Sequence, residues 1–137
     1  MHIINIYPHE VFQAVADATR IRILRLFADS NEEACVCELV DSLFEAEYNV
    51  SRHLKILRRA GLLTASKEGR WVYHRLVSDV PYFAYLYDTL RALPDKGKVF
   101  SADLKAFRKR IGLREKGRCR VGVQTRELAM GQLRARQ

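Results

Sequence analysis

Two cysteines stand one residue apart in the segment CVCEL, at Cys35 and Cys37, where a helical pattern begins. Because thiolates are soft ligands, a pair at this spacing can hold a soft metal or metalloid ion. The alternative is that both are small apolar core residues. In a regular helix their side chains would diverge, whereas at an extended helix start residues two apart lie on the same side and their sulfurs can converge.

Position 35 is also where a helix that begins at Val36 needs its N-cap, and Glu38 follows three residues later. Serine or threonine there would complete a capping box. A thiol is a poorer acceptor, so the sequence forgoes a cap worth about 0.5–2 kcal/mol. The N–H groups of a helix start favour thiolates. We therefore expect that closing both sulfurs on one atom unwinds the first turn of this helix.

The third cysteine, Cys119, lies far along the chain between Arg118 and Arg120. The two arginines are expected to lower the pKa of this thiol and to make it reactive. Cys119 either supplies a third sulfur to Cys35 and Cys37 or is an incidental exposed thiol. The residues alone leave both interpretations open.

A second group of residues with chemical potential is cationic. On a helical wheel, residues 50–60 separate into an apolar arc and a basic arc of about 120° that holds no acid. This division suits a helix in the major groove of DNA, with donors turned toward bases and phosphates, although a solvated basic face is the alternative. His53 falls on the apolar side, so we expect it to be packed or bonded to backbone. The expected DNA contacts are Asn49, Ser51, Arg52, Lys55 and, beside the turn of the following hairpin, Arg70.

Hydrophobic periodicity predicts the elements that position these residues. We expect helices over 9–17, 18–28, 36–44 and 49–60, with a turn over 45–49. Strands over 62–66 and 70–77 follow as a hairpin, then a helix that opens at Pro81 and another with Ser101 as its N-cap. This order predicts a mainly α fold with a β-hairpin wing, which is a winged helix-turn-helix.

The net charge of +8 is unevenly distributed along the chain. Residues 1–94 carry 11 Lys/Arg against 12 Asp/Glu, and residues 95–137 carry 13 against 4. We therefore expect a DNA-binding and dimerisation domain over 1–94 and a basic, partly helical C-terminal extension over 95–137. Such a charge favours nucleic acid as a partner, and acidic partners second.

Two further expectations concern location and assembly. No apolar run approaches the ~20 residues of a membrane span and no signal peptide is recognisable, so we expect no membrane partner and a cytoplasmic protein with reduced thiols. The helix after Pro81 carries more apolar side chains than a small domain can cover, and with the first helix it should form a two-fold dimer interface. Those side chains are Tyr82, Phe83, Tyr85, Leu86, Tyr87 and Leu90.

Four segments together resemble the ArsR/SmtB family of metal-responsive bacterial repressors. DATRIRILRLF is similar to the family's second helix, and CVCEL to the inducer-binding motif of its arsenic-responsive branch. VSRHLKILRRAGLL is similar to the recognition helix and KEGRWVYHRL to the wing. The segments occur in the family's order and spacing, and the resemblance covers about residues 10–93 and reaches at most residue 111.

The resemblance implies a homodimeric winged-helix protein that binds double-stranded operator DNA and leaves it when an inducer binds. In the arsenic-responsive branch the inducer is trivalent arsenic or antimony, held by thiolates. For this chain the resemblance implies a repressor of an arsenic-resistance operon with no permanently bound cofactor. As(III) or Sb(III) would be bound by Cys35, Cys37 and, as one alternative, Cys119.

The chain also departs from the family's patterns. A third cysteine that often follows in the arsenic-responsive branch is replaced by Val40. The zinc-sensing branch uses Asp and His pairs on the last helix of the domain, where this chain offers Asp88 and no histidine. The segment from residue 112 onward resembles nothing in the family.

Three alternatives to an arsenic-responsive repressor stay open on the residues alone. On the same fold the thiols could sense oxidation or persulfide, or the chain could be an architectural nucleic-acid binder that ignores metalloids. We do not expect an enzyme, because the chain lacks a Gly-rich phosphate loop and local spacing places no histidine beside a cysteine.

Overall fold

The structure is a computed structural model that describes residues 6–130, so residues 1–5 and 131–137 of the two expected units lie outside the described residues. Its elements are α1 (Pro8–Val15), α2 (Ala18–Ser30), β1 (Ala34–Cys35), α3 (Val36–Leu43), α4 (Glu47–Arg59), β2 (Leu63–Glu68), β3 (Trp71–Leu76), α5 (Pro81–Ala92), η1 (Lys96–Lys98) and α6 (Val99–Ile111). None of the described helices has the length and apolar character that a membrane crossing requires.

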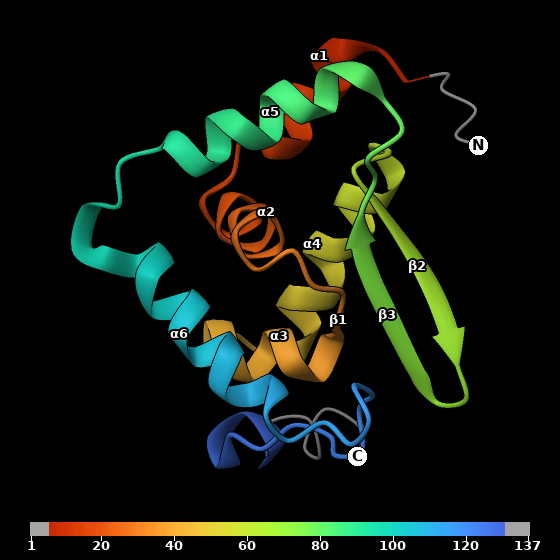
Figure 1. Ribbon diagram of the computed structural model, residues 1–137, viewed down its shortest axis with the longest axis vertical. Coiled ribbons are helices and arrows are strands. Elements are labelled where there is room, and N and C mark those ends of the chain that lie inside the picture. The colour runs from red at the N-terminus through yellow and green to blue at the C-terminus, as the bar shows by residue number, and fades with distance from the viewer. Residues whose placement is uncertain (1–5, 131–137) are drawn as a thin grey trace.

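The expected winged helix-turn-helix is confirmed. Helices α3 and α4 are joined by a short turn, and the hairpin of β2 and β3 extends from them as the wing (Figure 1). The turn between α3 and α4 is shorter than predicted, because α4 is already helical at Glu47. Phe44 takes a left-handed conformation at φ 53° and ends α3, and Glu47 adds a favourable acidic charge to the first turn of α4.

A two-residue strand, β1, extends the wing into a three-stranded sheet in the order β1-β3-β2. Ala34 pairs with His74 and Cys35 with Tyr73, both antiparallel. The sequence did not predict this strand, because two residues are too short to show an alternating pattern. As a result, the first cysteine of CVCEL is hydrogen-bonded into the wing sheet at the point where α3 begins.

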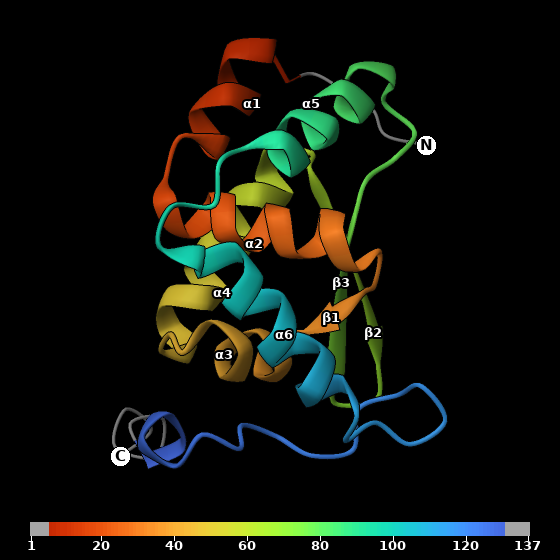
Figure 2. The ribbon, with the colours of Figure 1, turned by 60° about the vertical axis from the view of Figure 1, so that its left-hand side comes forward.

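Helix α2 forms the centre of the core. Asp17 caps this helix by accepting a hydrogen bond from the Arg20 N–H at 3.0 Å, and Ile23 and Leu24 are fully buried. Helices α4, α5 and α6 all pack against α2, as the two views together show (Figures 1 and 2). Phe107 of α6 is also fully buried, so residues beyond 94 contribute to the same core.

The prediction of Ser101 as an N-cap is wrong. Helix α6 begins at Val99, and the Asp95 carboxylate accepts from the N–H groups of Phe100 at 2.9 Å and Ser101 at 3.0 Å. The Asp95 side chain therefore caps the helix from the turn that precedes it. Lys98, with φ 56°, places the chain so that this contact can form.

The expected excess of exposed apolar surface on α5 is also wrong. Phe83, Leu86, Tyr87 and Leu90 are buried within the same chain, because α5 packs across α2. Tyr85 stays 76% exposed. Near the same end of the molecule, Tyr7 and Phe12 are exposed at and beside α1, so the apolar surface there is real but smaller than predicted.

Candidate DNA-binding surface and thiol site

The amphipathic division predicted for α4 is present in the structure. Val50, Leu54 and Leu57 are fully buried against the rest of the domain. The opposite side, called here the cationic face of α4, is exposed and consists of Ser51, Arg52, Lys55, Arg58 and Arg59. Asn49, also expected at the DNA, is half-buried in the first turn.

One arginine of this face is bound to the wing. The Arg58 Nη1 atom lies 2.6 Å from Nε2 of His74, which is buried in β3. Burial and, to a smaller extent, the Arg58 charge lower the pKa of His74 to about 4, so the ring is neutral and Nε2 accepts the hydrogen bond. No local pattern in the sequence marks this link, because it joins two different elements. The link couples α4 to the wing.

His53 is buried, as expected, but its contacts are to arginine side chains and not to backbone. Its Nδ1 atom lies 3.2 Å from Arg20 Nη1, and its Nε2 atom lies 3.5 Å from Arg52 Nη2. Burial lowers the pKa of His53 against the opposing effect of the Asp17 carboxylate. A neutral ring can accept from one guanidinium, so His53 helps to place the base of the cationic face.

The wing tip carries the last of the expected DNA contacts. Gly69 makes the turn with φ +61°, in the left-handed region that glycine adopts without strain. Arg70 follows it, is exposed, and has its guanidinium carbon 4.4 Å from the centroid of the Trp71 ring. This stacking holds the cation at the end of the hairpin.

Cys35 and Cys119 meet at the start of α3, and Cys37 packs beside them. Cys35 and Cys119 are buried with 2.8 Å between their Sγ atoms, and both are free thiols. Cys37 is half-buried, its thiol donates to the carbonyl oxygen of Val121 at 3.7 Å, and it packs beside Cys35 and Cys119. The ligand atoms of Cys35, Cys119 and the Glu38 carboxylate all lie within 4.8 Å of one another.

The expectation of a lowered pKa for Cys119 is wrong. Burial raises the pKa of Cys119 to about 11. The neighbouring Arg118 and Arg120 do not offset this effect, because each pairs with a carboxylate and not with the sulfur. The hydrogen bond to Cys37, together with burial, raises the pKa of Cys35. The same bond lowers the pKa of Cys37, against its own burial. Cys37 is therefore the thiol that ionises first.

Residues 112–125, called here the C-terminal strap, carry Cys119 to this place. Figure 2 shows the strap leaving α6 and crossing beneath α3. Arg114 donates to Glu38 from Nε at 2.7 Å and from Nη2 at 2.9 Å, and both side chains are buried. Glu38 also accepts from the Cys35 N–H at 3.0 Å. Burial raises the pKa of Glu38, but these hydrogen bonds outweigh it and the pKa lies below its ordinary value.

The Arg114–Glu38 pair anchors one end of the strap, and a second set of contacts anchors its far end. The Arg110 Nε atom donates to the Asp41 carboxylate of α3 at 2.6 Å, and Asp41 also accepts from the N–H groups of Gln124 and Thr125. Arg110 Nη2 donates to the carbonyl oxygen of Gly122 at 2.9 Å. The strap between the two anchors is thus fixed against α3 on both sides of Cys119.

Arg118 joins the strap to the wing. Its guanidinium bridges Glu33, just before β1, and Glu68 of β2, and lies 3.9 Å over the Tyr73 ring. The Cys119 N–H donates to the Tyr73 hydroxyl at 2.9 Å. Sequence reasoning missed these contacts because the partners are some fifty or more positions apart, and the basic tail offered no local signal.

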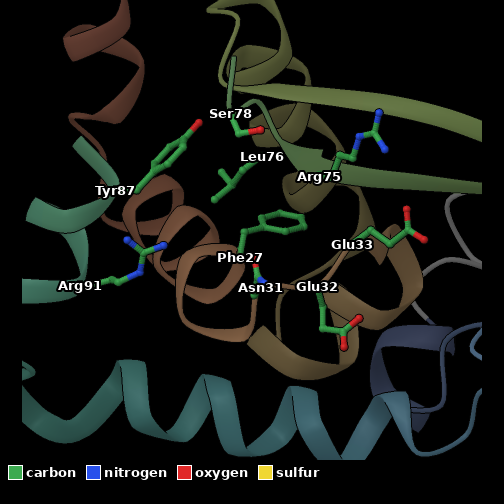
Figure 3. A pocket seen from close by; sticks show the side chains of 9 residues that line it. All are labelled: Phe27, Asn31, Glu32, Glu33, Arg75, Leu76, Ser78, Tyr87 and Arg91. Atoms are coloured by element: carbon green, nitrogen blue, oxygen red, sulfur yellow. The ribbon is translucent and has the colours of Figure 1, made fainter. Parts of the chain in front are cut away.

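Two cavities of about 530 Å³ each lie among the described residues. One adjoins the thiols and is lined by Cys35, Val36, Cys37, Glu47, Arg70, Trp71, Val72, Gly122 and Val123. The other lies between α2, α5 and the end of β3 (Figure 3). There the Tyr87 hydroxyl donates to the Val77 carbonyl and Arg91 donates to the Ala28 carbonyl, so these polar groups hold α5 to its neighbours.

Comparisons with known proteins agree with this geometry. The family described as "Bacterial regulatory protein, arsR family" matches residues 17–65. The chain is 42% identical over 89 residues to an arsenic resistance transcriptional regulator of Pseudomonas putida, covering 64% of this chain and 76% of that protein. It is 40% identical over 77 residues to the arsenical resistance operon repressor of Escherichia coli, covering 56% of this chain and 65% of the relative.

Among solved structures, the transcriptional regulator HlyU of Vibrio vulnificus superposes with a TM-score of 0.51 at 34% sequence identity. The superposition covers 61% of this chain and 86% of HlyU. By their names, these relatives are transcriptional regulators or operon repressors.

Proposed function

Because this chain belongs to the arsR family of bacterial regulatory proteins, we propose that it represses an arsenic-resistance operon and is released from DNA by trivalent arsenic or antimony. The protein would act as a homodimer on double-stranded operator DNA. Asn49, Ser51, Arg52, Lys55 and Arg70 would make the DNA contacts. The inducer would bind to the thiols of Cys35, Cys37 and Cys119.

The observation that carries this proposal is the contact between the Cys35 and Cys119 sulfurs at the start of α3, with Cys37 packed beside them. Arsenous acid reacts with three thiols to give a tris-thiolate and three waters, so no oxidant and no net proton transfer are needed. Cys37, with its lowered pKa, supplies the first thiolate. Cys35 and Cys119 then displace the remaining hydroxyls, and their protons leave with the departing water.

Repression would be lost through the contacts of Cys35 with the wing. A bound arsenic atom must separate Cys35 and Cys119 beyond their present 2.8 Å and draw Cys37 toward them. Cys35 is both the N-cap of α3 and a partner of Tyr73 in the sheet, so this movement strains the first turn of α3 and the pairing of β1 with β3. His74 of β3 passes the change to Arg58 on the recognition helix. A coupling of about 1–3 kcal/mol between inducer and DNA is ordinary for such a switch.

The test is DNA binding with and without arsenite, measured by mobility shift on the DNA upstream of the protein's own gene. Wild type should bind and then dissociate as arsenite is added. Cys35→Ser and Cys37→Ser should bind but stay bound, and Cys119→Ser should lose most of its response to arsenite. A Cys35→Ser, Cys37→Ser double variant that still dissociates fully would contradict the proposed site.

A thiol-redox function is the second candidate, favoured by the separation of 2.8 Å between Cys35 and Cys119. A peroxide would oxidise these two thiols to a disulfide and be reduced to two waters, and a thiol reductant would reverse the change. This reading predicts release of DNA by peroxide in Cys37→Ser but not in Cys119→Ser. Arsenite without peroxide distinguishes the two functions, because only the first predicts release under reducing conditions.

A further inference from the structure

We propose that the C-terminal strap is a further DNA-contacting element, whose turn at residues 115–118 meets the DNA backbone beside the wing. The inference rests on the proposed function, because it takes α4 and the wing as the parts of the chain that hold the operator. It adds a contact from a segment outside the family match, which covers residues 17–65.

The turn at residues 115–118, called here the strap turn, is a tight and regular hairpin turn. The Glu115 N–H donates to the Arg118 carbonyl oxygen and the Arg118 N–H donates to the Glu115 carbonyl oxygen, both at 3.0 Å. The central residues, Lys116 and Gly117, have φ of 53° and 75°, and positive φ at both positions is the pattern of a type I′ turn. Both are exposed, and a Cβ added at Gly117 would meet no heavy atom within 4 Å. The strap turn therefore projects into solvent and presents the charge of Lys116.

The strap turn lies next to the turn of the wing. Arg118 forms an ion pair with Glu68, which is the last residue of β2 and pairs with Trp71 across the wing turn. Arg70 lies in the wing turn and lines the same cavity as Val123 of the strap. Both views place the strap and the tip of the wing at the same end of the molecule (Figures 1 and 2). A duplex held by the wing tip would therefore run beside the strap turn.

Exposed cations come from both segments. Lys67 and Arg70 belong to the wing, and Lys116 and Arg120 belong to the strap. Clustered lysine and arginine side chains are the electrostatic footprint of a nucleic-acid contact. Because double-stranded DNA carries one negative charge per ~1.7 Å of its axis, several of these cations can meet phosphates at once.

The carboxylates at this end of the molecule are paired, so they oppose a phosphate less. Glu33 and Glu68 both pair with the Arg118 guanidinium, and Glu115 pairs with Arg120 at 3.3 Å. An arginine has five N–H donors, so Arg120 can hold Glu115 and a phosphate together. The strap turn has the sequence EKGR, which contains no apolar side chain. It therefore fits a polyanion better than the apolar surface of another protein.

The strap turn is held in place before any DNA binds. On the side that leads into the turn, Arg114 pairs with buried Glu38. On the side that leaves it, the N–H of buried Cys119 donates to the hydroxyl of Tyr73 in β3 at 2.9 Å. A contact made by an ordered turn loses less conformational entropy on binding than one made by a flexible segment. The strap turn is thus preorganised for a backbone contact.

Two substitutions remove the positive charge and keep the turn. Asparagine before glycine is strongly preferred in a type I′ turn, so Lys116→Asn should leave the strap turn intact. Arg120→Gln removes the second cation at an exposed site. The two together are called here the strap variant. Lys105→Gln with Arg108→Gln makes the same change of net charge at exposed positions of α6, across the molecule from the wing (Figure 1), and is the matched control.

The experiment measures binding of the full-length protein to its operator at several salt concentrations and the hydroxyl-radical footprint of each complex. Compared with wild type, the strap variant should lose protection at the outer edges of the footprint and keep it in the interior. Its plot of log affinity against log salt should be shallower by about 1.8, because each of the two phosphate contacts contributes about 0.9 to the slope. The α6 control should keep the footprint and the slope of wild type.

The proposal is overturned if the strap variant keeps the footprint and the salt dependence of wild type, because the cations would then face a partner other than DNA. It is also overturned if the α6 control loses as much slope as the strap variant, since net charge and not contact would be the cause. Tighter operator binding by the strap variant would contradict it as well. Failure of wild type to bind the operator would instead count against the proposed function, so the two failures are distinguishable.

Discussion

Glu38 and Arg114 form a buried ion pair that joins the helix after Cys35 to the strap that carries Cys119, with 2.7 Å between Arg114 Nε and Glu38 Oε2. The same carboxylate accepts from the Cys35 N–H, so one side chain positions two of the three thiols. Removing one partner of a buried pair leaves an uncompensated charge. The effect of such a substitution should therefore reach both the stability of the fold and the thiol site.

Arg114→Ala should lower the free energy of unfolding by about 3–5 kcal/mol, measured by urea titration, because Glu38 would stay buried without its cation. Arg120→Ala is the control, since Arg120 pairs with Glu115 at an exposed site where such pairs contribute about 0–1 kcal/mol. Similar losses in both variants would mean that the buried pair has no special role.

The bridge from Arg118 to Glu68 predicts that the strap holds the wing in position. Arg118→Glu should weaken operator binding and reduce the response to arsenite, because the new carboxylate would repel those of Glu33 and Glu68 next to Cys119. Adding Glu68→Arg to this variant should partly restore operator binding and the response to arsenite. Fluorescence anisotropy with labelled operator measures both. If the double variant is no better than Arg118→Glu alone, the bridge does not position the wing.

On the cationic face of α4, Arg52 and Lys55 are expected to make different kinds of contact. Arg52→Ala should cost about 1–3 kcal/mol of operator binding if it reads a base, and the loss should depend on the operator sequence. Lys55→Ala should weaken all sequences alike and reduce the slope of affinity against salt, as expected for a phosphate contact. Arg108→Ala, an exposed arginine of α6, is the control and should change neither.

The pKa directions of the three thiols predict the order in which they react. Brief treatment with iodoacetamide near neutral pH should modify Cys37 first, because its hydrogen bond with Cys35 lowers its pKa and its side chain is half-buried. Cys119, with its pKa raised to about 11, and buried Cys35 should react slowly. Mass spectrometry of the digested protein identifies the first site. Equal labelling of all three would contradict the assigned order.

His74 predicts a dependence of stability on pH. Its pKa in the folded chain is about 4, below the value of about 6.5 in an unfolded chain, so the unfolded state binds the proton more readily. The contribution is complete above pH ~6.5 and is lost as the pH falls toward 4, by about 3 kcal/mol in total. His74→Gln should flatten this part of the stability curve in urea titrations at several pH values. His9→Gln, at an exposed site, should leave the curve unchanged.

The sequence alone determined the parts of this protein that depend on neighbouring residues. The 3.6-residue and two-residue hydrophobic periods predicted the helices and the wing. The helical period also predicted that Val50 and Leu54 are buried and that Arg52 and Lys55 lie on the exposed face of α4. The position of Cys35 at the start of α3 was predicted for the same reason, since a helix start is a local property.

Contacts between distant segments were decided by the tertiary structure. Cys119 reaches Cys35 across 84 positions because the packing of α6 on α2 and α3 directs the strap beneath α3, and buried arginines hold it there. No local pattern marks such a pairing, which is why the tail was predicted as a basic extension and Cys119 as a thiol with a lowered pKa. Burial reversed that pKa, and burial is a property of the packed chain and not of the residues that flank the sulfur.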